Sequence, residues 1–254
     1  DTAFHQTLDK ERYLYPLPLE YYTDLKVRKY GAHGTSHKYV SQQAIEMLGN
    51  PKESRIIVCH LGNGASISAV QDGKCVDTSM GFTPLAGVMM GTRSGDVDPS
   101  VMPYLCKKLN KTADEVLEIY NKKSGMLGIS GISSDSRDIE NALFNEGNER
   151  ALLTGLLYSR IVSKYIGQYF VELGGLDAIA FTAGVGENAA YLRRLIIDDC
   201  SRALGLFLNE ESNEIRSDEN RLISHPFSKI DVFVIPTNEE VEIARDTMKL
   251  LHLG

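Results

Sequence analysis

Residues 59–70 read Cys-His-Leu-Gly-Asn-Gly-Ala-Ser-Ile-Ser-Ala-Val, and this stretch decides the fold. It continues an apolar run, so residues 56–59 are expected to form a buried strand. Small polar and apolar residues alternate over 65–70, which predicts a second strand. The turn between them, residues 62–64, carries no bulky side chain. Its backbone N–H groups could approach a phosphate, or the turn could simply close a hairpin.

Further strands and helices follow on both sides of this stretch. Asp72-Gly73 is a hairpin signal, and a third strand is expected over 74–78. Apolar runs predict two more strands, at 177–182 and 229–235. Helical spacing of apolar residues or capping signals predict helices over 37–48, 99–109, 151–173, 189–204 and 241–251, with a loop over 205–216. The alternation of strands and helices indicates an α/β protein.

Composition excludes several classes of protein. The chain has 254 residues and a net charge of −7, whereas a nucleic-acid binder would show a basic patch. The four cysteines lie far apart without metal-ligand spacing, so they are expected to be small buried apolar residues. No apolar run approaches the roughly 18 residues that span a bilayer. The chain opens on the polar residue Asp1 rather than Met, so we expect that sequence before Asp1 is missing.

A glycine-rich segment, residues 31–37, places His33 just before a helix. A helix N-terminus favours an anion, so His33 is a candidate for binding one. The alternative is that His33 and His37 are only loop and capping groups. Their spacing of four could also suggest a metal pair, but the Gly-Thr-Ser between them argues against regular helix there.

A second glycine-rich segment surrounds Arg93. Its guanidinium offers a planar fork of donors that suits a phosphoryl group. Asp96 and Asp98 follow closely, so the alternative is an ordinary ion pair. The density of glycine around Arg93 favours a functional role.

A strand, a glycine turn and a helix follow one another again over 177–204, a layout that presents a helix N-terminus to a nucleotide phosphate. Gly184-x-Gly186-x-x-Ala189 resembles a dinucleotide fingerprint, but no acidic residue ends a second strand about 20 residues later. We therefore reject NAD binding, and no Walker A loop occurs either. The Gly/Ser-rich loop 124–138 could wrap a nucleoside or merely connect two helices.

The residues alone thus predict a nucleotide-dependent phosphotransferase without a P-loop, because such chemistry needs little beyond positioning and neutralising phosphates. Nine stretches then resemble the acetate kinase family in collinear order: DTAFHQT (1–7), YPLP (15–18), GAHGTSH (31–37), CHLGNGAS (59–66), DTSMGFTPL (77–85), MGTRSGDVDP (90–99), SGISSDSRDI (130–139), FTAGVGENAA (181–190) and VIPTNEE (234–240). The resemblance implies a ribonuclease-H-like mixed five-stranded sheet flanked by helices. This would be one actin-like ATPase domain of two, covering residues 1–240, with 241–254 as a closing helix that packs on the N-terminal domain.

The resemblance also implies a role for each matching residue. The catalytic residues would be Asp1, His33 and Arg93. The distal phosphates of ATP or ADP would be held by His60, Asn63 and Gly64. The rest of the nucleotide would contact Asp135, Ser136, Arg137, Gly184, Val185, Gly186 and Asn188. Glu239 would bind Mg²⁺, or Mn²⁺ in its place. Pro84 would line a small acyl pocket with Ala32, which stands where many members carry Phe and which could admit propionate.

The implied reaction transfers a phosphoryl group from ATP to acetate in the cytoplasm, within a homodimer and without nucleic-acid or membrane partners. This chain alone is expected to be inactive. The alternatives are a propionate or other short-chain acyl kinase, a sugar kinase, a heat-shock-like ATPase, and a nucleotide-binding or dimerisation fragment without catalysis.

Overall fold

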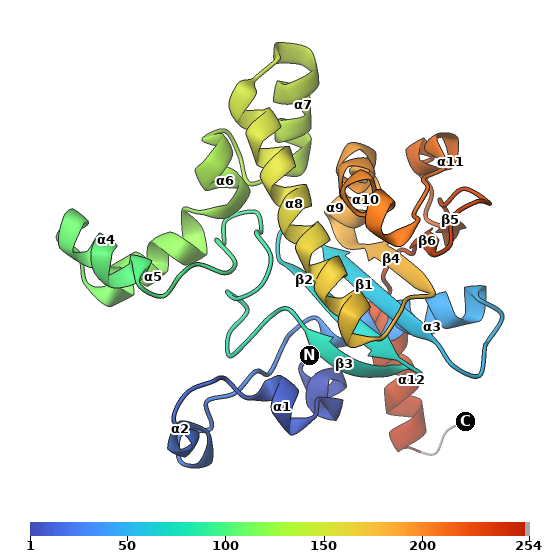
Figure 1. Ribbon diagram of the computed structural model, residues 1–254, viewed down its shortest axis with the longest axis horizontal. Helices are drawn as coiled ribbons and strands as arrows, with labels where there is room; N and C mark the ends of the chain where they lie inside the picture. Colours follow the sequence, from blue (N-terminus) through green and yellow to red (C-terminus); the bar gives the residue numbers. More distant parts are fainter. Residues whose placement is uncertain (252–254) are drawn as a thin grey trace.

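The computed structural model describes residues 1–251, apart from the side chains of Asp246, Lys249 and Leu250 (Figure 1). Its centre is a mixed six-stranded sheet in the order β3-β2-β1-β4-β6-β5. The strands are β1 (Arg55–Leu61), β2 (Ala65–Gln71), β3 (Lys74–Thr78), β4 (Ala178–Thr182), β5 (Arg221–Leu222) and β6 (Asp231–Val234).

The pairing of the strands determines where the site lies. β1 and β2 form an antiparallel hairpin, in which Leu61 pairs with Ala65. β1, β4 and β6 are parallel neighbours, and His60 of β1 pairs with Thr182 of β4. The segments that follow these three strands therefore leave the sheet at the same edge. That edge brings together the turn 62–64, the start of the segment 183–188 and the segment 235–239.

Helices cover both faces of this sheet. The helices are η1 (Ala3–Thr7, a 3₁₀ helix), α1 (Lys10–Tyr13), α2 (Leu19–Thr23), α3 (Gly34–Met47), α4 (Val101–Leu109), α5 (Ala113–Lys122), α6 (Gly125–Ser130), α7 (Ser136–Glu146), α8 (Glu149–Glu172), α9 (Ala183–Asn188), α10 (Ala190–Leu204), α11 (Glu210–Glu214) and α12 (Glu239–Leu250). Figure 1 shows α8 crossing in front of the sheet and α4 with α5 extending away from it.

Strand alternation divides the core between the two faces. Ile57, Cys59 and Leu61 of β1 belong to the larger cluster, which includes residues of α8 and α10. Ile56 and Val58 belong to the smaller cluster, which includes residues of α3. The same alternation places Ser66 and Ser68 of β2 on the α3 face, because Ala65, Ile67 and Ala69 fill the other one.

The expected architecture is confirmed as a mixed sheet flanked by helices, with one correction: the sheet has six strands rather than five. The additional strand, β5, has only two residues and pairs antiparallel with the edge of β6. Two residues are too few to produce a hydrophobic period, so the sequence pattern did not reveal this strand.

Several helices begin or end at other residues than the sequence pattern predicts. Asn209 caps the short helix α11 inside the expected loop 205–216, by accepting from the Ser212 backbone N–H at 3.0 Å. α4 begins at Val101 rather than at the proline of the expected 99–109 helix. The expected helix 189–204 begins at Ala190 as α10, after the separate helix α9.

Three cysteines are buried as expected, whereas Cys106 is only partly buried. Among the described residues, none of the helices is long and apolar enough to cross a membrane. The end of the expected segment 241–254, residues 252–254, lies outside the described residues.

Candidate functional site

The turn after β1 lies at the centre of the site. The Gly62 N–H donates to the Gly64 carbonyl at 3.0 Å, which closes a tight loop. A Cβ atom built on Gly64 would lie 3.4 Å from Nε2 of His33 and 3.5 Å from Nη1 of Arg93. The two side chains that the sequence singled out from separate segments therefore converge on one point beside this turn.

His33 is held there by its neighbour in space, Asp1. His33 has a left-handed backbone with φ of 57°, which is uncommon for a residue with a side chain. Its backbone N–H donates to Oδ2 of Asp1 at 2.8 Å, and the Gly34 N–H donates to the Asp1 carbonyl at 2.7 Å. His33 is thus the N-cap residue of α3, which begins three residues before the expected start at His37. Asp1 is therefore positioned to fix the backbone of His33.

Arg93 lies on a loop that is anchored on both sides. The Gly91 N–H donates to the Asn63 carbonyl at 3.0 Å, and the Met90 N–H donates to the Arg93 carbonyl at 3.0 Å. A Cβ on Gly91 would lie 1.9 Å from Oδ1 of Asn63, so glycine here leaves room for the Asn63 side chain in its present position. The guanidinium donates from Nη1 to the Pro84 carbonyl at 3.4 Å.

The alternative ion pair for Arg93 is not formed. Oδ1 of Asp96 instead accepts from the Gly87 N–H at 2.8 Å, and Oδ1 of Asp98 accepts from the Ser100 N–H at 2.8 Å. In the described part of the chain, no carboxylate pairs with Arg93. Its charge is therefore available for an anion, such as a phosphoryl group.

His60 lies under His33 and is almost fully buried. The two rings stack with centroids 4.2 Å apart. Nδ1 of His60 bonds Oγ of Ser36 at 2.8 Å, and that hydroxyl bonds Oγ1 of Thr237 at 2.8 Å. Burial lowers the pKa of His60 to about 3, so the ring is neutral near pH 7. Burial, together with the nearby Arg93, also lowers the pKa of His33.

These buried neutral histidines predict acid sensitivity of the fold. Burial lowers the pKa of His5 to about 4, while an unfolded histidine titrates near pH 6.5. The unfolded chain therefore binds more protons than the folded chain as the pH falls below about 6.5. We expect His5 and His60 each to remove about 3 kcal/mol from the free energy of unfolding between about pH 7 and pH 4.

Urea unfolding at a series of pH values measures this loss. The His5→Gln variant should lose part of the pH dependence, whereas His225→Gln, at a partly exposed position, should keep it. An unfolding free energy that is the same at about pH 7 and about pH 4 would contradict the assignment of neutral, buried rings.

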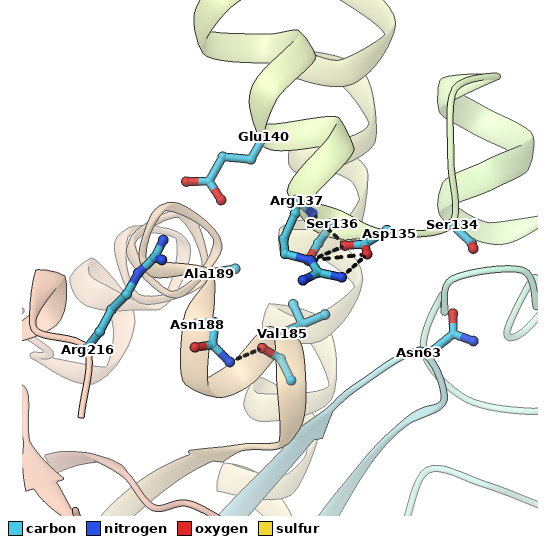
Figure 2. Close-up of a pocket in the computed structure, with 11 residues that line it drawn as sticks. Asn63, Ser134, Asp135, Ser136, Arg137, Glu140, Val185, Asn188, Ala189 and Arg216 are labelled. Atoms are coloured by element: carbon cyan, nitrogen blue, oxygen red, sulfur yellow. Dashed lines mark hydrogen bonds and ion pairs between the residues drawn. The ribbon is translucent and has the colours of Figure 1, made fainter. Parts of the chain in front are cut away.

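A cavity of about 590 Å³ opens beside the turn (Figure 2). It is lined by seven residues that the sequence assigned to nucleotide binding: Asn63, Asp135, Ser136, Arg137, Gly184, Val185 and Asn188. Asp135 caps α7 by accepting from the Arg137 backbone N–H at 2.9 Å. Nδ2 of Asn188 donates to the Gly184 carbonyl at 2.9 Å. The volume is in the range of a small-molecule site.

The helix α9 on one wall of this cavity is held by the buried side chain of Arg193 and by the partly buried side chain of Glu187. Nη1 of Arg193 donates to the carbonyls of Gly186 and Glu187, each at 2.9 Å, and Nε donates to Oδ1 of Asn213 at 2.8 Å. Oε1 of Glu187 accepts from the Ala183 N–H at 2.8 Å. Gly186 is buried and, unlike Gly184, is not one of the residues that line the cavity.

The remaining predicted residues lie around the turn. Ala32 is buried directly before His33, and Pro84 meets Arg93 through its carbonyl. Glu239 is the first residue of α12 and is exposed, at the sheet edge where β6 ends. The described residues include no group of three His, Cys, Asp or Glu side chains that could hold a metal. Both ring nitrogens of His37 are hydrogen-bonded, to Ser66 and Ser68, which argues against the His33–His37 metal pair.

Comparison with known proteins adds the family. The model of the acetokinase family matches residues 1–245. The chain belongs to the acetokinase family. Acetate kinases of Geobacillus sp. (strain WCH70) and Bacillus subtilis (strain 168) are 56% and 55% identical to it, over 100% and 98% of its length. The chain spans only 64% and 63% of the length of these acetokinase relatives.

Solved acetokinase structures resemble the fold closely. The acetate kinase of Porphyromonas gingivalis superposes with a TM-score of 0.94 at 47% identity, over 99% of this chain and 63% of its own. A propionate kinase from Francisella tularensis subsp. tularensis SCHU S4 superposes with a TM-score of 0.90 at 43% identity, over 97% and 62%. The resemblance to the acetokinase family seen in the sequence is therefore confirmed.

Some residues that line the cavity were not singled out from the sequence. The cavity is also lined by Ser134, Glu140, Ala189 and Arg216. Glu140 follows Ser136 by four residues, a helical spacing that could have revealed it. Arg216 and the Arg193–Asn213 contact follow no local pattern, since they join segments distant in sequence. The alternating polar residues of β2 were noticed as strand residues, but their contact with histidines was not expected.

Proposed function

We propose that this chain contributes the nucleotide site and the phosphoryl-binding residues of an acetate kinase. The complete enzyme would transfer the γ-phosphoryl group of ATP to acetate, giving acetyl phosphate and ADP. The observation that carries this proposal is the convergence of His33 Nε2 and Arg93 Nη1 beside Gly64. This point adjoins Asn63, which lines the cavity proposed for the nucleotide.

The mechanism follows from the charges of the reactants. Acetate is already an anion near pH 7, so its attack needs no strong general base. The barrier comes from repulsion between two anions and from their alignment, and Arg93 and His33 reduce both as donors to the moving phosphoryl oxygens. Asp1 holds His33 through its backbone N–H. Asn63 and Gly64, with His60 beneath, position the distal phosphates.

Mg²⁺ would neutralise phosphate charge when bound. The chemistry of Glu239 fits a Mg²⁺ ion, which often keeps several waters and takes one or two carboxylates together with substrate phosphates. A dedicated cage of protein ligands is therefore not required. The segment before Glu239 is bonded to His60 through Thr237 and Ser36, which supports a position for Glu239 near the phosphate end of the proposed site.

We propose that residues 1–240 form one of two domains and that α12 contacts the other. α12 is attached to α3 by an ion pair of 2.8 Å between Lys38 and the buried Glu242. Its outer face still exposes Val241, Ile243 and Met248, and Leu251, directly after the helix, is exposed as well. An apolar stripe on a closing helix suits packing against a second domain.

An assay for acetyl phosphate tests the activity. The chain is incubated with ATP, Mg²⁺ and acetate, alone and together with the part of a relative's acetate kinase that it does not span. Trapping acetyl phosphate with hydroxylamine should give product only in the combined sample. Product from the chain alone would contradict the two-domain proposal, and no product in either sample would contradict the activity.

Propionate is the second candidate acceptor, because the family resemblance puts Ala32 where many members carry the larger Phe. Running the combined sample with propionate in place of acetate separates the two. A higher kcat/KM for propionate would identify the chain as part of a propionate kinase.

We also propose that the enzyme is a homodimer in the cytoplasm. Leu152, Leu153 and Leu156 of α8 are about half exposed, which favours a contact surface there. Sedimentation equilibrium that gives only the monomer mass would contradict the dimer.

A further inference from the structure

A chain of buried hydrogen bonds runs from the interior to His33. Oγ of Ser68 bonds Nδ1 of His37 at 2.7 Å. Nε2 of His37 bonds Oγ of Ser66 at 2.7 Å, and the same oxygen bonds Nδ1 of His33 at 2.8 Å. Ser66, Ser68 and His37 are fully buried, so no bulk water takes part. The far nitrogen of His33, Nε2, is the one that faces Arg93 beside Gly64.

The number of protons limits how this chain can be arranged. Each serine hydroxyl has one proton, and each neutral imidazole has one N–H. Burial lowers the pKa of His33 and places that of His37 well below the usual value, so both rings are neutral near pH 7. Each of the three hydrogen bonds in this chain needs one proton. Three arrangements supply one proton to every hydrogen bond, and they differ in which ring nitrogens carry the protons.

In the first arrangement every donor points toward the site. The Ser68 hydroxyl donates to His37 Nδ1, His37 Nε2–H donates to Ser66, and the Ser66 hydroxyl donates to His33 Nδ1. His33 then carries its proton on Nε2. Every proton along the chain has an acceptor, and the last N–H is offered to a ligand.

In the second arrangement every donor points inward, and the proton of Ser68 is left over. Among the residues that the structure describes, His37 Nδ1 is the one recorded partner of the Ser68 hydroxyl. Ser68 is fully buried, so its hydroxyl would remain without an acceptor. In the third arrangement His37 Nε2–H and His33 Nδ1–H both donate to Ser66, and the proton of the fully buried Ser66 is left without an acceptor among the described residues. An unsatisfied buried donor lowers the population of an arrangement by a factor of roughly 5 to 150. The first arrangement is therefore strongly favoured.

We infer that Ser68, His37 and Ser66 are positioning residues that fix His33 as the Nε2–H tautomer. This inference rests on the proposed function, in which His33 faces a phosphoryl oxygen. A neutral Nε2–H donates a hydrogen bond to that oxygen, whereas the other tautomer would turn a lone pair toward it. The histidine thus acts as a donor throughout the reaction and transfers no proton.

Nitrogen NMR on isotopically labelled histidine tests this inference in the chain itself, without substrate or turnover. The unprotonated ring nitrogen has a distinct chemical shift, so the spectrum reports the tautomer, and His33→Gln identifies the signals of that ring. We expect His33 and His37 to carry their protons on Nε2. A His33 ring with its proton on Nδ1 would overturn the inference, whatever the enzyme's activity.

Variants of the chain test the coupling. Ser66→Ala removes the partner of His33 Nδ1, and Ser68→Ala removes the group that sets the direction, so both should give a mixture of His33 tautomers. Ser66→Thr and Ser68→Thr keep the hydroxyl and should restore the single form. Ser41→Ala is the matched control, because Ser41 is equally buried on α3 but donates to the Lys38 backbone carbonyl. An unchanged His33 tautomer in folded Ser66→Ala would overturn the inference.

The combined sample adds a kinetic measurement. Ser66→Ala should lower kcat by about tenfold, the value of one neutral hydrogen bond, with a much smaller change in the KM for ATP. Ser41→Ala should leave kcat unchanged. If the wild-type sample forms no acetyl phosphate, the proposed function fails, and the NMR result still decides the tautomer separately. A Ser66→Ala kcat equal to wild type would contradict the positioning role.

Discussion

Replacing Arg93 by alanine is expected to lower kcat by about 100- to 1000-fold in the combined sample, because it removes a charged donor from the transition state. The guanidinium pairs with no carboxylate among the described residues, so removing its charge breaks no ion pair in the folded chain. It also lies outside the residues that line the cavity. The affinity for ATP should therefore change little, and the fold should remain stable.

The measurements are kcat from acetyl phosphate formation and the Kd for ATP from calorimetry. Arg93→Lys keeps the charge but loses the planar fork, so it should recover only part of the rate. Arg194→Ala is the matched control: Arg194 is exposed on α10, away from the turn, and pairs with Glu210. An Arg93→Ala enzyme that turns over at the wild-type rate would rule out the proposed role.

The sheet could be predicted from the sequence because its strands carry strong local signals. Residues 56–61 are a continuous apolar run broken only by His60, and Asp72-Gly73 is a hairpin turn with both φ values positive, 52° and 75°. β5 and α11 could not be predicted, because two and five residues are too short to show a period. Their positions depend on pairing with β6 and on capping by Asn209.

The candidate site, too, could be predicted from the sequence only in part. His33 and Arg93 were recognisable because glycines surround both, and the family resemblance gave their roles. Their convergence at Gly64 depends on the Asp1 contact and on the bond between Gly91 and Asn63, which join segments about 30 residues apart. No local pattern contains that information. The serines of β2 show the same limit: alternation placed them on one face, but not against His37.

Gly64→Ala should lower turnover strongly while leaving the protein folded. The added methyl group would meet His33 Nε2 at 3.4 Å and Arg93 Nη1 at 3.5 Å, which are close but tolerable contacts, and Gly64 does not have a positive φ. The free protein therefore accommodates alanine with little strain. The methyl group nevertheless occupies the space between the two donors, where the phosphoryl group is proposed to lie. We expect kcat to fall by about 100-fold or more, comparable to the loss of a principal donor.

The control separates blocking of the site from a general effect of replacing glycine. A Cβ on Gly167 of α8 would have no atom within 4 Å, and Ala is favoured over Gly inside a helix by about 1 kcal/mol. Gly167→Ala should therefore be at least as stable as wild type and fully active. Thermal unfolding and acetyl phosphate formation are measured on both variants. If Gly64→Ala were folded and fully active, the phosphoryl group could not lie between His33 and Arg93, because the methyl group and the phosphoryl oxygens would require the same space.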